Sequence, residues 1–383
     1  MKRLWFLIFV FYGCSVFAPL QKGKVISLYH LIETGKYEDA KELAEEMALG
    51  EESSQWANTW YARGLLSQTA YREGIKNNDP KMYELYPGQL YVAWESYERA
   101  RTIDKRERML RQLSPKYVNL ANDFQELGHK ELKKGNYQEA LKAFEQTLAI
   151  EKLPFLSLKQ DTSLIYNTGL AAYQGKNWDK AKQYLGKLHK YRYSPNATHL
   201  LFRTQMMMED TTAAEQVLYE GLQYYDDHED LVLLLVQVLY NHQRIQEALE
   251  VIDAAILEDP ETPSFYYSKG LIHQKSGNYR KAIDAYKNAV NLDPSRQMAY
   301  VNIATCYYNI GVTYEETALK LTDKRAVVKE REKSEKAFQM ALSWLEQAMK
   351  AEPTDTKVVE KIRYLLEAMG RPEKAQRLLR NFQ

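Results

Sequence analysis

The residue types that most often carry out chemistry are few and scattered in this chain of 383 residues. None of the seven histidines belongs to a His-Glu-x-x-His pattern or a His-rich tract, so no local spacing provides converging metal ligands. The sequence contains no glycine-rich phosphate loop, nucleophile elbow or dinucleotide fingerprint. Cys306 stands among Ala304, Thr305 and Tyr307, where a small buried side chain is expected. We therefore expect no enzymatic activity, no metal and no cofactor.

Composition excludes further classes of protein. The chain has 52 Lys and Arg against 51 Asp and Glu, for a formal charge of +1, so neither nucleic acid nor an anionic membrane surface is expected as the main partner. A hydrophobic content of 45% is too high for an intrinsically disordered chain. Two cysteines are too few for a disulfide-stapled scaffold or a cysteine-rich zinc site.

The N-terminus has the pattern of a targeting segment. Lys2 and Arg3 precede an apolar run at 4–12, and a basic region followed by a short apolar region is typical of a secretory signal. The run is too short to span a bilayer, which requires about 20 apolar residues. We expect the mature chain to be exported to the periplasm or anchored to the outer membrane of a bacterial envelope.

The processing site has two interpretations. Val16-Phe17-Ala18 suits signal peptidase and gives a signal peptide at 1–18. The stretch from Phe11 to Cys14 resembles a loose bacterial lipobox, which gives a lipoprotein signal at 1–13 and a membrane anchor on lipidated Cys14.

The elements that would position any binding residue are repeated. Between Pro263 and Pro294, small and apolar residues recur every three or four positions on both sides of a Gly-Asn break. This pattern predicts a helix, a tight turn and a second helix. Gly270 and Ala282 stand twelve positions apart, and we expect these two small residues to face each other. Pro294 ends the unit because proline cannot continue a helix.

This unit resembles the tetratricopeptide repeat, in which an aromatic residue, Leu-Gly, Ala-x3-aromatic and Pro recur over 34 residues. The match is strong from about residue 120 to Pro294 and looser outside that range. One alanine marks the second helix of each copy: Ala40, Ala93, Ala140, Ala181, Ala214, Ala248, Ala282, Ala341 and Ala375. Four of the eight intervals between these anchor alanines are 33 or 34 residues.

The resemblance implies an all-α fold, a right-handed superhelical solenoid of about nine helix pairs. We expect divergent repeat-like helices with an insert at 19–119 and regular repeats at 120–294. At 295–383 we expect further pairs with extended charged helices and a C-terminal cap. Basic and acidic residues nearly balance between 315 and 336, so this segment is expected to be a solvated protrusion.

In such a solenoid the first helix of each pair lines a concave face, where a partner peptide lies. The alignment predicts a Tyr- and Asn-rich binding face there, formed by Gln125, His129, Tyr166, Asn167, Tyr173, His199, Arg203, Gln237, Tyr240, Asn241, Tyr267, Asn302 and Tyr308. Tyrosine buries a large area and keeps a hydrogen-bonding tip, while Asn and Gln pair with a peptide backbone.

Two functions are compatible with this face. Resemblance to exported bacterial repeat lipoproteins implies a scaffold that binds a protein or peptide. The alternative is a glycan or cell-wall fragment stacked on Tyr166, Tyr173, Tyr267 and Tyr308. The clamp for a partner's C-terminal carboxylate, known in chaperone-binding members of the family, is not expected, because Tyr267 and Leu271 stand where it needs Lys and Asn.

Overall fold

The computed structural model describes residues 17–226, 228–352 and 355–380. In these residues all regular secondary structure is helical. The chain divides into two compact units, Met1–Tyr193 and Ser194–Gln383. The expected targeting segment, at 1–18 or 1–13, lies largely outside the described residues, and so does Cys14. None of the described helices is long and apolar enough to cross a bilayer.

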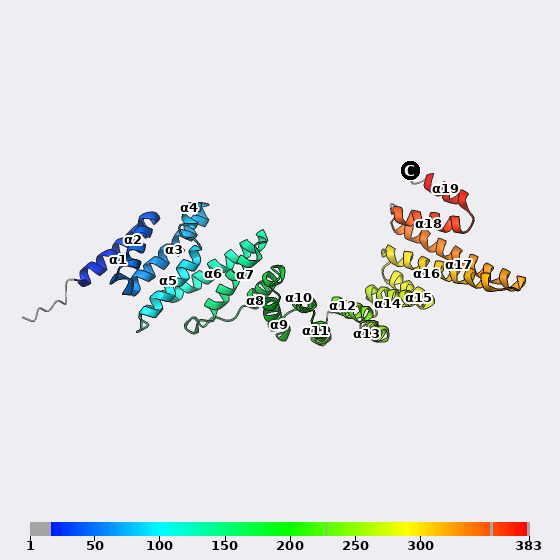
Figure 1. The fold of residues 1–383 in the computed structure, drawn as a ribbon, viewed down its shortest axis with the longest axis horizontal. Helices are drawn as coiled ribbons and strands as arrows, with labels where there is room; N and C mark the ends of the chain where they lie inside the picture. Colours follow the sequence, from blue (N-terminus) through cyan, green and yellow to red (C-terminus); the bar gives the residue numbers. More distant parts are fainter. Residues whose placement is uncertain (1–16, 227, 353–354, 381–383) are drawn as a thin grey trace, which may run out of the picture. The chain divides into compact units, whose positions relative to one another are not determined.

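The first unit contains four helix pairs, each made of two helices that pack against each other across a short connection (Figure 1). We call the two members of a pair its first and second helix. The pairs are α1 (Phe17–Glu33) with α2 (Tyr37–Leu49), α3 (Ala57–Asn77) with α5 (Gln89–Ile103), α6 (Leu110–Lys134) with α7 (Tyr137–Glu151), and α8 (Thr162–Gln174) with α9 (Trp178–Lys190). A single short helix, α4 (Pro80–Tyr83), lies between α3 and α5, and Asp79 caps it by accepting a hydrogen bond from the Lys81 amide.

The second unit contains five pairs built in the same way. They are α10 (Pro195–Met207) with α11 (Thr211–Tyr224), α12 (Glu229–Asn241) with α13 (Ile245–Glu258), α14 (Pro263–Lys275) with α15 (Tyr279–Leu292), α16 (Gln297–Lys320) with α17 (Lys324–Ala351), and α18 (Thr356–Ala368) with α19 (Pro372–Arg380). The described residues therefore form nine pairs, and the predicted all-α fold of repeated helix pairs is confirmed.

The anchor alanines fix the register of the repeats. Each of the nine lies on the second helix of a different pair, and each has at most 1% of its surface exposed. A methyl group at this position lets the two helices of a pair approach closely, since no larger side chain separates them. The periodic alanines thus predicted the number of pairs correctly.

The contact made by the repeat glycine differs from our expectation. A Cβ placed on Gly270 would lie 2.5 Å from Cε1 of Tyr286, and its nearest neighbours are atoms of this ring rather than of Ala282. Gly128 and Gly64 have the same relation to aromatic rings on their partner helices. The glycine is therefore needed because it leaves room for a large ring and not because it faces another small residue.

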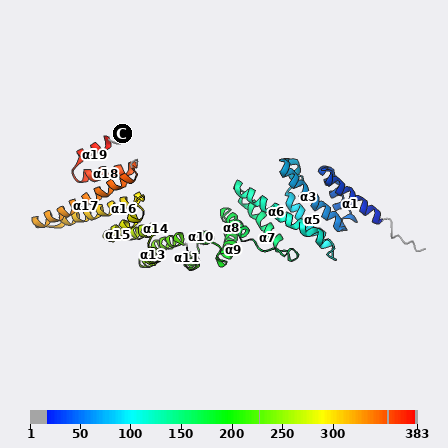
Figure 2. The same ribbon diagram turned by 180° about the vertical axis from the view of Figure 1, so that it is seen from behind.

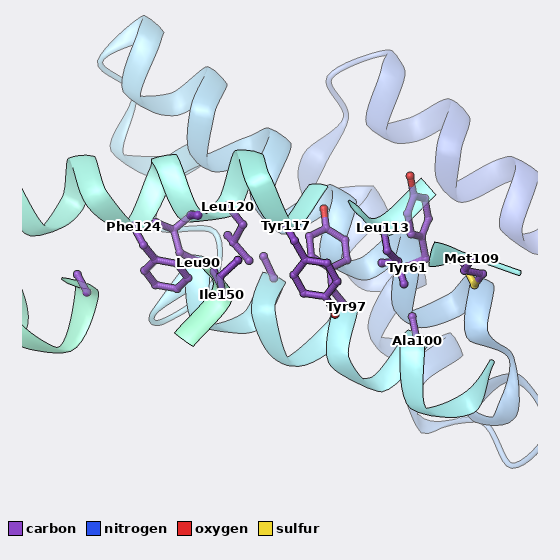
Figure 3. Packing of buried hydrophobic residues seen from close by; sticks show 13 residues of the cluster. Tyr61, Leu90, Tyr97, Ala100, Met109, Leu113, Tyr117, Leu120, Phe124 and Ile150 are labelled. Carbon is purple, nitrogen blue, oxygen red and sulfur yellow. The ribbon is translucent and has the colours of Figure 1, made fainter. Parts of the chain in front are cut away.

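Aromatic rings fill the core of the first unit. Tyr97 of α5 and Tyr117 of α6 are fully buried, and their ring centroids lie 5.9 Å apart in an edge-to-face arrangement. Figure 3 shows them between Leu90 and Leu113, in a cluster drawn from α3, α5, α6 and α7. Each tyrosine keeps a hydrogen bond for its hydroxyl, as buried tyrosines require.

A buried polar network joins the first helices α3 and α6. Asp123 accepts hydrogen bonds from Gln68 Nε2 at 2.7 Å and from Arg72 Nε at 2.8 Å. Gln68 in turn accepts a hydrogen bond from the Tyr97 hydroxyl at 2.9 Å. Burial raises the pKa of Asp123, although its hydrogen bonds to Gln68 and Arg72 oppose this effect. Arg72 also donates to the Asn119 carbonyl at 2.9 Å, so the network links two neighbouring pairs in register.

The hairpin of α16 and α17 is longer than its neighbours, with 24 and 28 residues. In Figures 1 and 2 its free end, drawn yellow to orange, projects past the helices beside it. Buried small residues recur every seven positions along its seam: Ala304, Gly311 and Ala318 on α16, and Ser334, Ala341 and Ala348 on α17.

This seam repeats the glycine-to-aromatic contact of the regular pairs, but seven residues closer to the free end of the hairpin. A Cβ on Gly311 would lie 2.6 Å from Cε1 of Phe338, and the Ser334 hydroxyl donates to the Gly311 carbonyl at 2.9 Å. A seven-residue period keeps one face of each helix against the other, as in a coiled coil. The extension therefore has its own specific packing.

Candidate functional site

All thirteen residues of the predicted binding face lie on first helices. Those on α6 and α8 belong to the first unit and those on α10, α12, α14 and α16 to the second. None of them is fully buried: Arg203, Gln237, Asn241 and Tyr308 are exposed, and the other nine are half-buried. The first five residues thus belong to a surface of the first unit, and the last eight belong to a surface of the second.

In the first unit, two of the predicted residues pack against aromatic rings of their own helix pair. The His129 ring packs edge-on against Phe144 with centroids 5.1 Å apart. Tyr173 packs in the same manner against Trp178 at 5.7 Å. Gln125 lies one turn before His129 on α6 and is half-buried. These rings are thus partly used to hold their own helix pair together.

The other tyrosine of this surface, Tyr166, lies beside an exposed ring. Tyr166 lies 6.0 Å from Tyr193, centroid to centroid, and 38% of Tyr193 is exposed. Burial raises the pKa of the Tyr166 hydroxyl, and the neighbouring Tyr193 adds to this effect. Asn167 follows directly on α8 and is half-buried.

In the second unit the structure brings two predicted residues into direct contact. The Asn302 amide of α16 donates to the Tyr267 hydroxyl of α14 at 3.1 Å. Arg296 spans the same two pairs, since its guanidinium lies 5.6 Å from the centroid of the Tyr267 ring and donates to Ser264 Oγ at 3.2 Å. Neighbouring first helices are therefore linked by polar side chains that belong to different repeats.

Five further predicted residues of this unit lie on α10 and α12. Burial and the nearby Arg203 lower the pKa of His199, and Asp230 of α12 acts in the opposite direction. The Lys275 ammonium lies 5.1 Å from the centroid of the Tyr240 ring, a cation–π distance. Gln237 and Asn241 are exposed near the C-terminal end of α12.

A hollow of this surface lies between α16, α17 and α18. It has a volume of about 530 Å³, within the range of small ligand pockets. Its lining residues are Ala304, Thr305, Tyr308, Asn309, Ala341, Leu345, Lys361, Tyr364, Leu365 and Ala368. We call this hollow the α16–α18 groove.

The α16–α18 groove has an apolar floor and a polar, aromatic rim. Its floor residues Leu345 and Leu365 are almost fully buried, whereas Tyr308 is 41% and Tyr364 62% exposed. Lys361 is an exposed cation beside these rings. Such a groove suits an apolar or aromatic side chain flanked by a hydrogen-bonding backbone or a carboxylate.

Sequence reasoning found Tyr308 but missed the residues that α18 contributes. The sequence of α18 lacks the Leu-Gly pattern, so its position in the repeat alignment was not assigned. Counting back from the anchor alanine would have revealed it, because Tyr364 precedes Ala375 by eleven positions, as Leu271 precedes Ala282.

The cysteine and the candidate metal ligands were also singled out by the sequence. Cys306 is fully buried, as the sequence predicted, and burial raises the pKa of its thiol to about 12. A thiol so far from ionisation at neutral pH is a poor nucleophile. No cluster of three or more His, Cys, Asp or Glu side chains suited to a metal ion occurs in the described part of the chain.

Comparison with known proteins agrees with this geometry. Residues 126–197, 205–272 and 263–296 match the tetratricopeptide repeat family. The chain is a tetratricopeptide repeat protein. Its repeats are the helix pairs described above.

Curated relatives match this repeat protein over short segments. Photosystem I assembly protein Ycf3 of Synechococcus elongatus is 37% identical over 73 residues, which is 18% of this chain and 42% of the relative. The peroxisomal targeting signal receptor of Kluyveromyces lactis is 28% identical over 87 residues, 23% of this chain and 15% of the receptor. The chain thus spans less than half the length of either relative.

A solved structure is similar over a longer range. It is the C-terminal part of a tetratricopeptide repeat protein of Cytophaga hutchinsonii, with 15% identity and a TM-score of 0.48. The similarity covers 67% of this chain and 92% of that one.

Proposed function

We propose that this protein is a non-enzymatic scaffold that binds a segment of a partner protein along the first helices of the unit Ser194–Gln383. The observation that carries the proposal is the α16–α18 groove, which combines an apolar floor with exposed tyrosines. Tyrosines of this kind are frequent anchors of protein interfaces.

The polar side chains near the groove suit a polypeptide. Thr305 and Asn309 line the groove itself, and Asn302 lies on the same helix. Hydroxyl and amide groups both donate and accept hydrogen bonds, so they can pair with a peptide backbone while the floor receives a side chain.

The names of two relatives support the same class of function. One is an assembly protein and the other a targeting signal receptor. Both names describe proteins that act on other proteins.

A glycan is the alternative occupant, because sugar rings stack on exposed tyrosine faces such as that of Tyr308. Each of the four tyrosines expected to stack on a sugar already has a group beside its ring, however. Tyr193 lies beside Tyr166, and Phe338 lies beside Tyr308. Arg296 lies over the ring of Tyr267, and Trp178 packs against Tyr173. The contacts therefore favour a protein segment.

The experiment that tests the scaffold places a photo-crosslinking amino acid at Tyr364 in the full chain in its native cells. We expect one discrete protein adduct, weakened by Tyr308→Ala on the opposite rim. The matched control is the same probe at Tyr191, which is 54% exposed but lies outside the groove. Equal adducts at both positions, or binding to a glycan array that Tyr308→Ala abolishes, would reject the protein-binding function.

We also propose that the protein is exported and acts in the bacterial envelope. Lys2, Arg3 and the apolar run at 4–12 support export. Labelling cells with a fatty acid and comparing the chain with its Cys14→Ser variant distinguishes the two processing sites. Label that is lost with Cys14 identifies a lipoprotein, whereas an unlabelled exported chain identifies cleavage after Ala18.

A further inference from the structure

The free end of the α16/α17 hairpin exposes aliphatic side chains. Leu319 is 74%, Val328 57% and Leu321 38% exposed. These residues lie at the end of α16, at the start of α17 and in the connection between them. We call residues 318–329 the hairpin tip.

Helix geometry turns two of these side chains to the same side of the hairpin. Ala318 is in heptad register with Gly311 on the seam, and Val327 is in register with Ser334. Leu319 and Val328 each follow a seam position by one residue. Because the helices run in opposite directions, a rotation of about 100° from the seam brings both side chains to one side.

The hairpin tip is also strongly basic. Lys320, Lys324, Arg325 and Lys329 are all exposed, and within the described chain none of them forms an ion pair. The single carboxylate of the tip, Asp323, accepts a hydrogen bond from the Ala326 amide and so caps α17. Four cations and one anion give the tip a net charge of +3 (4 − 1).

Further down the hairpin the charges are compensated. Glu330 pairs with Lys333 at 2.6 Å, and Arg331 with Glu315 at 3.8 Å. Glu316 and Glu332 are the next exposed carboxylates below the tip. The charge balance of 315–336 as a whole therefore conceals a basic end and a more acidic shaft.

We propose that the hairpin tip binds the surface of an anionic lipid bilayer. Leu319 and Val328 insert between the headgroups while the four cations contact lipid phosphates. Peripheral binding of this kind needs both a small apolar contact and a cluster of Lys and Arg, since either alone is weak.

This pairing of features distinguishes the bilayer from other anionic partners. Nucleic acid would use the cations but would leave the aliphatic side chains in water. An acidic protein is the remaining alternative, and the experiment below separates it from lipid. The proposal does not depend on the α16–α18 groove.

The first measurement is co-sedimentation of the full chain with vesicles of phosphatidylglycerol and phosphatidylcholine, compared with phosphatidylcholine alone. We expect stronger binding to the anionic vesicles, and weaker binding as salt screens the lysines. Leu319→Glu combined with Val328→Glu should reduce anionic binding by roughly tenfold, because it removes the apolar contact and adds repulsion. The matched control is Leu257→Glu on α13, where the leucine is 86% exposed, and this exchange should change nothing.

The apolar run at 4–12 is identical in all variants, so differences between them report the tip alone. A photo-crosslinking amino acid at Leu319 gives a second, local measurement, and a lipid adduct in anionic vesicles is the expected product. Equal sedimentation of the tip variant and the Leu257→Glu control would overturn the proposal. A protein adduct at Leu319 in intact cells without a lipid adduct would also overturn it and would identify an acidic protein as the partner.

Discussion

The close contact between Gly270 and the Tyr286 ring shows how one residue type controls the spacing of a helix pair. The nearest ring atom is 2.5 Å from the place of a Cβ, much less than the 3.5–4.0 Å at which carbon atoms attract each other. Tyr286 is fully buried and donates to Gln274 Oε1 at 2.6 Å. The ring is therefore held in place and has little freedom to move away.

Gly270→Ala should consequently destabilise the protein by about 1–3 kcal/mol, the usual cost of overpacking a core. The matched control is Gly186→Ala, because this helical glycine has no atom within 4 Å of the new Cβ. Alanine is a better helix former than glycine, so the control should be neutral or stabilising by about 0.5–1 kcal/mol. Thermal unfolding followed by circular dichroism checks both variants, and equal midpoints would contradict the contact.

The sequence pattern was sufficient to predict where the anchor alanines lie, but not which side chains surround the repeat residues. An alanine at a near-constant interval predicts a buried position on a second helix, and all nine anchors are buried. The partner of Gly270 was misjudged because sequence spacing does not specify which side chain reaches across a helix pair. Tyr364 was missed because the groove depends on α18, which lacks the repeat's glycine.

Among the helices, the contact between α3 and α6 depends on a carboxyl group with an altered pKa. Burial raises the pKa of Asp123, so the native state binds a proton more readily than the unfolded chain, in which the pKa is about 3.9. Wherever the native state binds more protons, stability falls as pH rises. The contribution of Asp123 therefore decreases from about pH 4 up to its raised native pKa.

Asp123→Asn removes this titration while keeping an acceptor for Gln68 and Arg72. We expect the difference in unfolding free energy between the native chain and this variant to decrease as pH rises through that window. Urea unfolding at a series of pH values measures it, with Asp284→Asn at an exposed position of α15 as the control. A difference that grows with pH would show instead that the ion pair with Arg72 determines the pKa.

The α16/α17 hairpin shows how two long helices keep specific packing along their whole length. Its seam places a small residue every seventh position, and Ala318 is only 2% exposed although it lies near the free end. The long interval between Ala282 and Ala341 predicted extended helices but not their heptad. The net charge of the segment also concealed the basic tip, because a net charge does not show where along the segment the charged residues stand.

Two neighbouring substitutions test this seam. Ala318→Glu forces a charge into the contact with α17, which is unfavourable without a partner. Leu319→Glu changes an exposed side chain and should leave the hairpin folded. Hydrogen exchange of residues 312–333 should accelerate by roughly tenfold or more in the first variant, as expected when local opening costs less. If both variants exchange equally, the seam does not hold the tip together.

At the scale of the whole molecule, the free energy of unfolding is distributed over many local interfaces rather than concentrated in one core. In repeat proteins each pair buries its apolar face against its neighbours, so the total is close to a sum of local interfaces. Each unit has hydrophobic clusters of its own: one around Tyr97 and Tyr117 belongs to Met1–Tyr193, and one around Val301 and Leu345 belongs to Ser194–Gln383. Neither cluster contains residues of the other unit.

It follows that residues 17–193 and 194–383, produced separately, should each fold into a helical, cooperatively melting protein. The sum of their circular dichroism spectra should reproduce the spectrum of the chain from residue 17. The partner captured through Tyr364 should bind to 194–383 with undiminished affinity, since the α16–α18 groove lies entirely within that fragment. A fragment that is folded but no longer binds would show that the partner also requires the first unit, and the binding face on α6 and α8 would then be the surface to mutate.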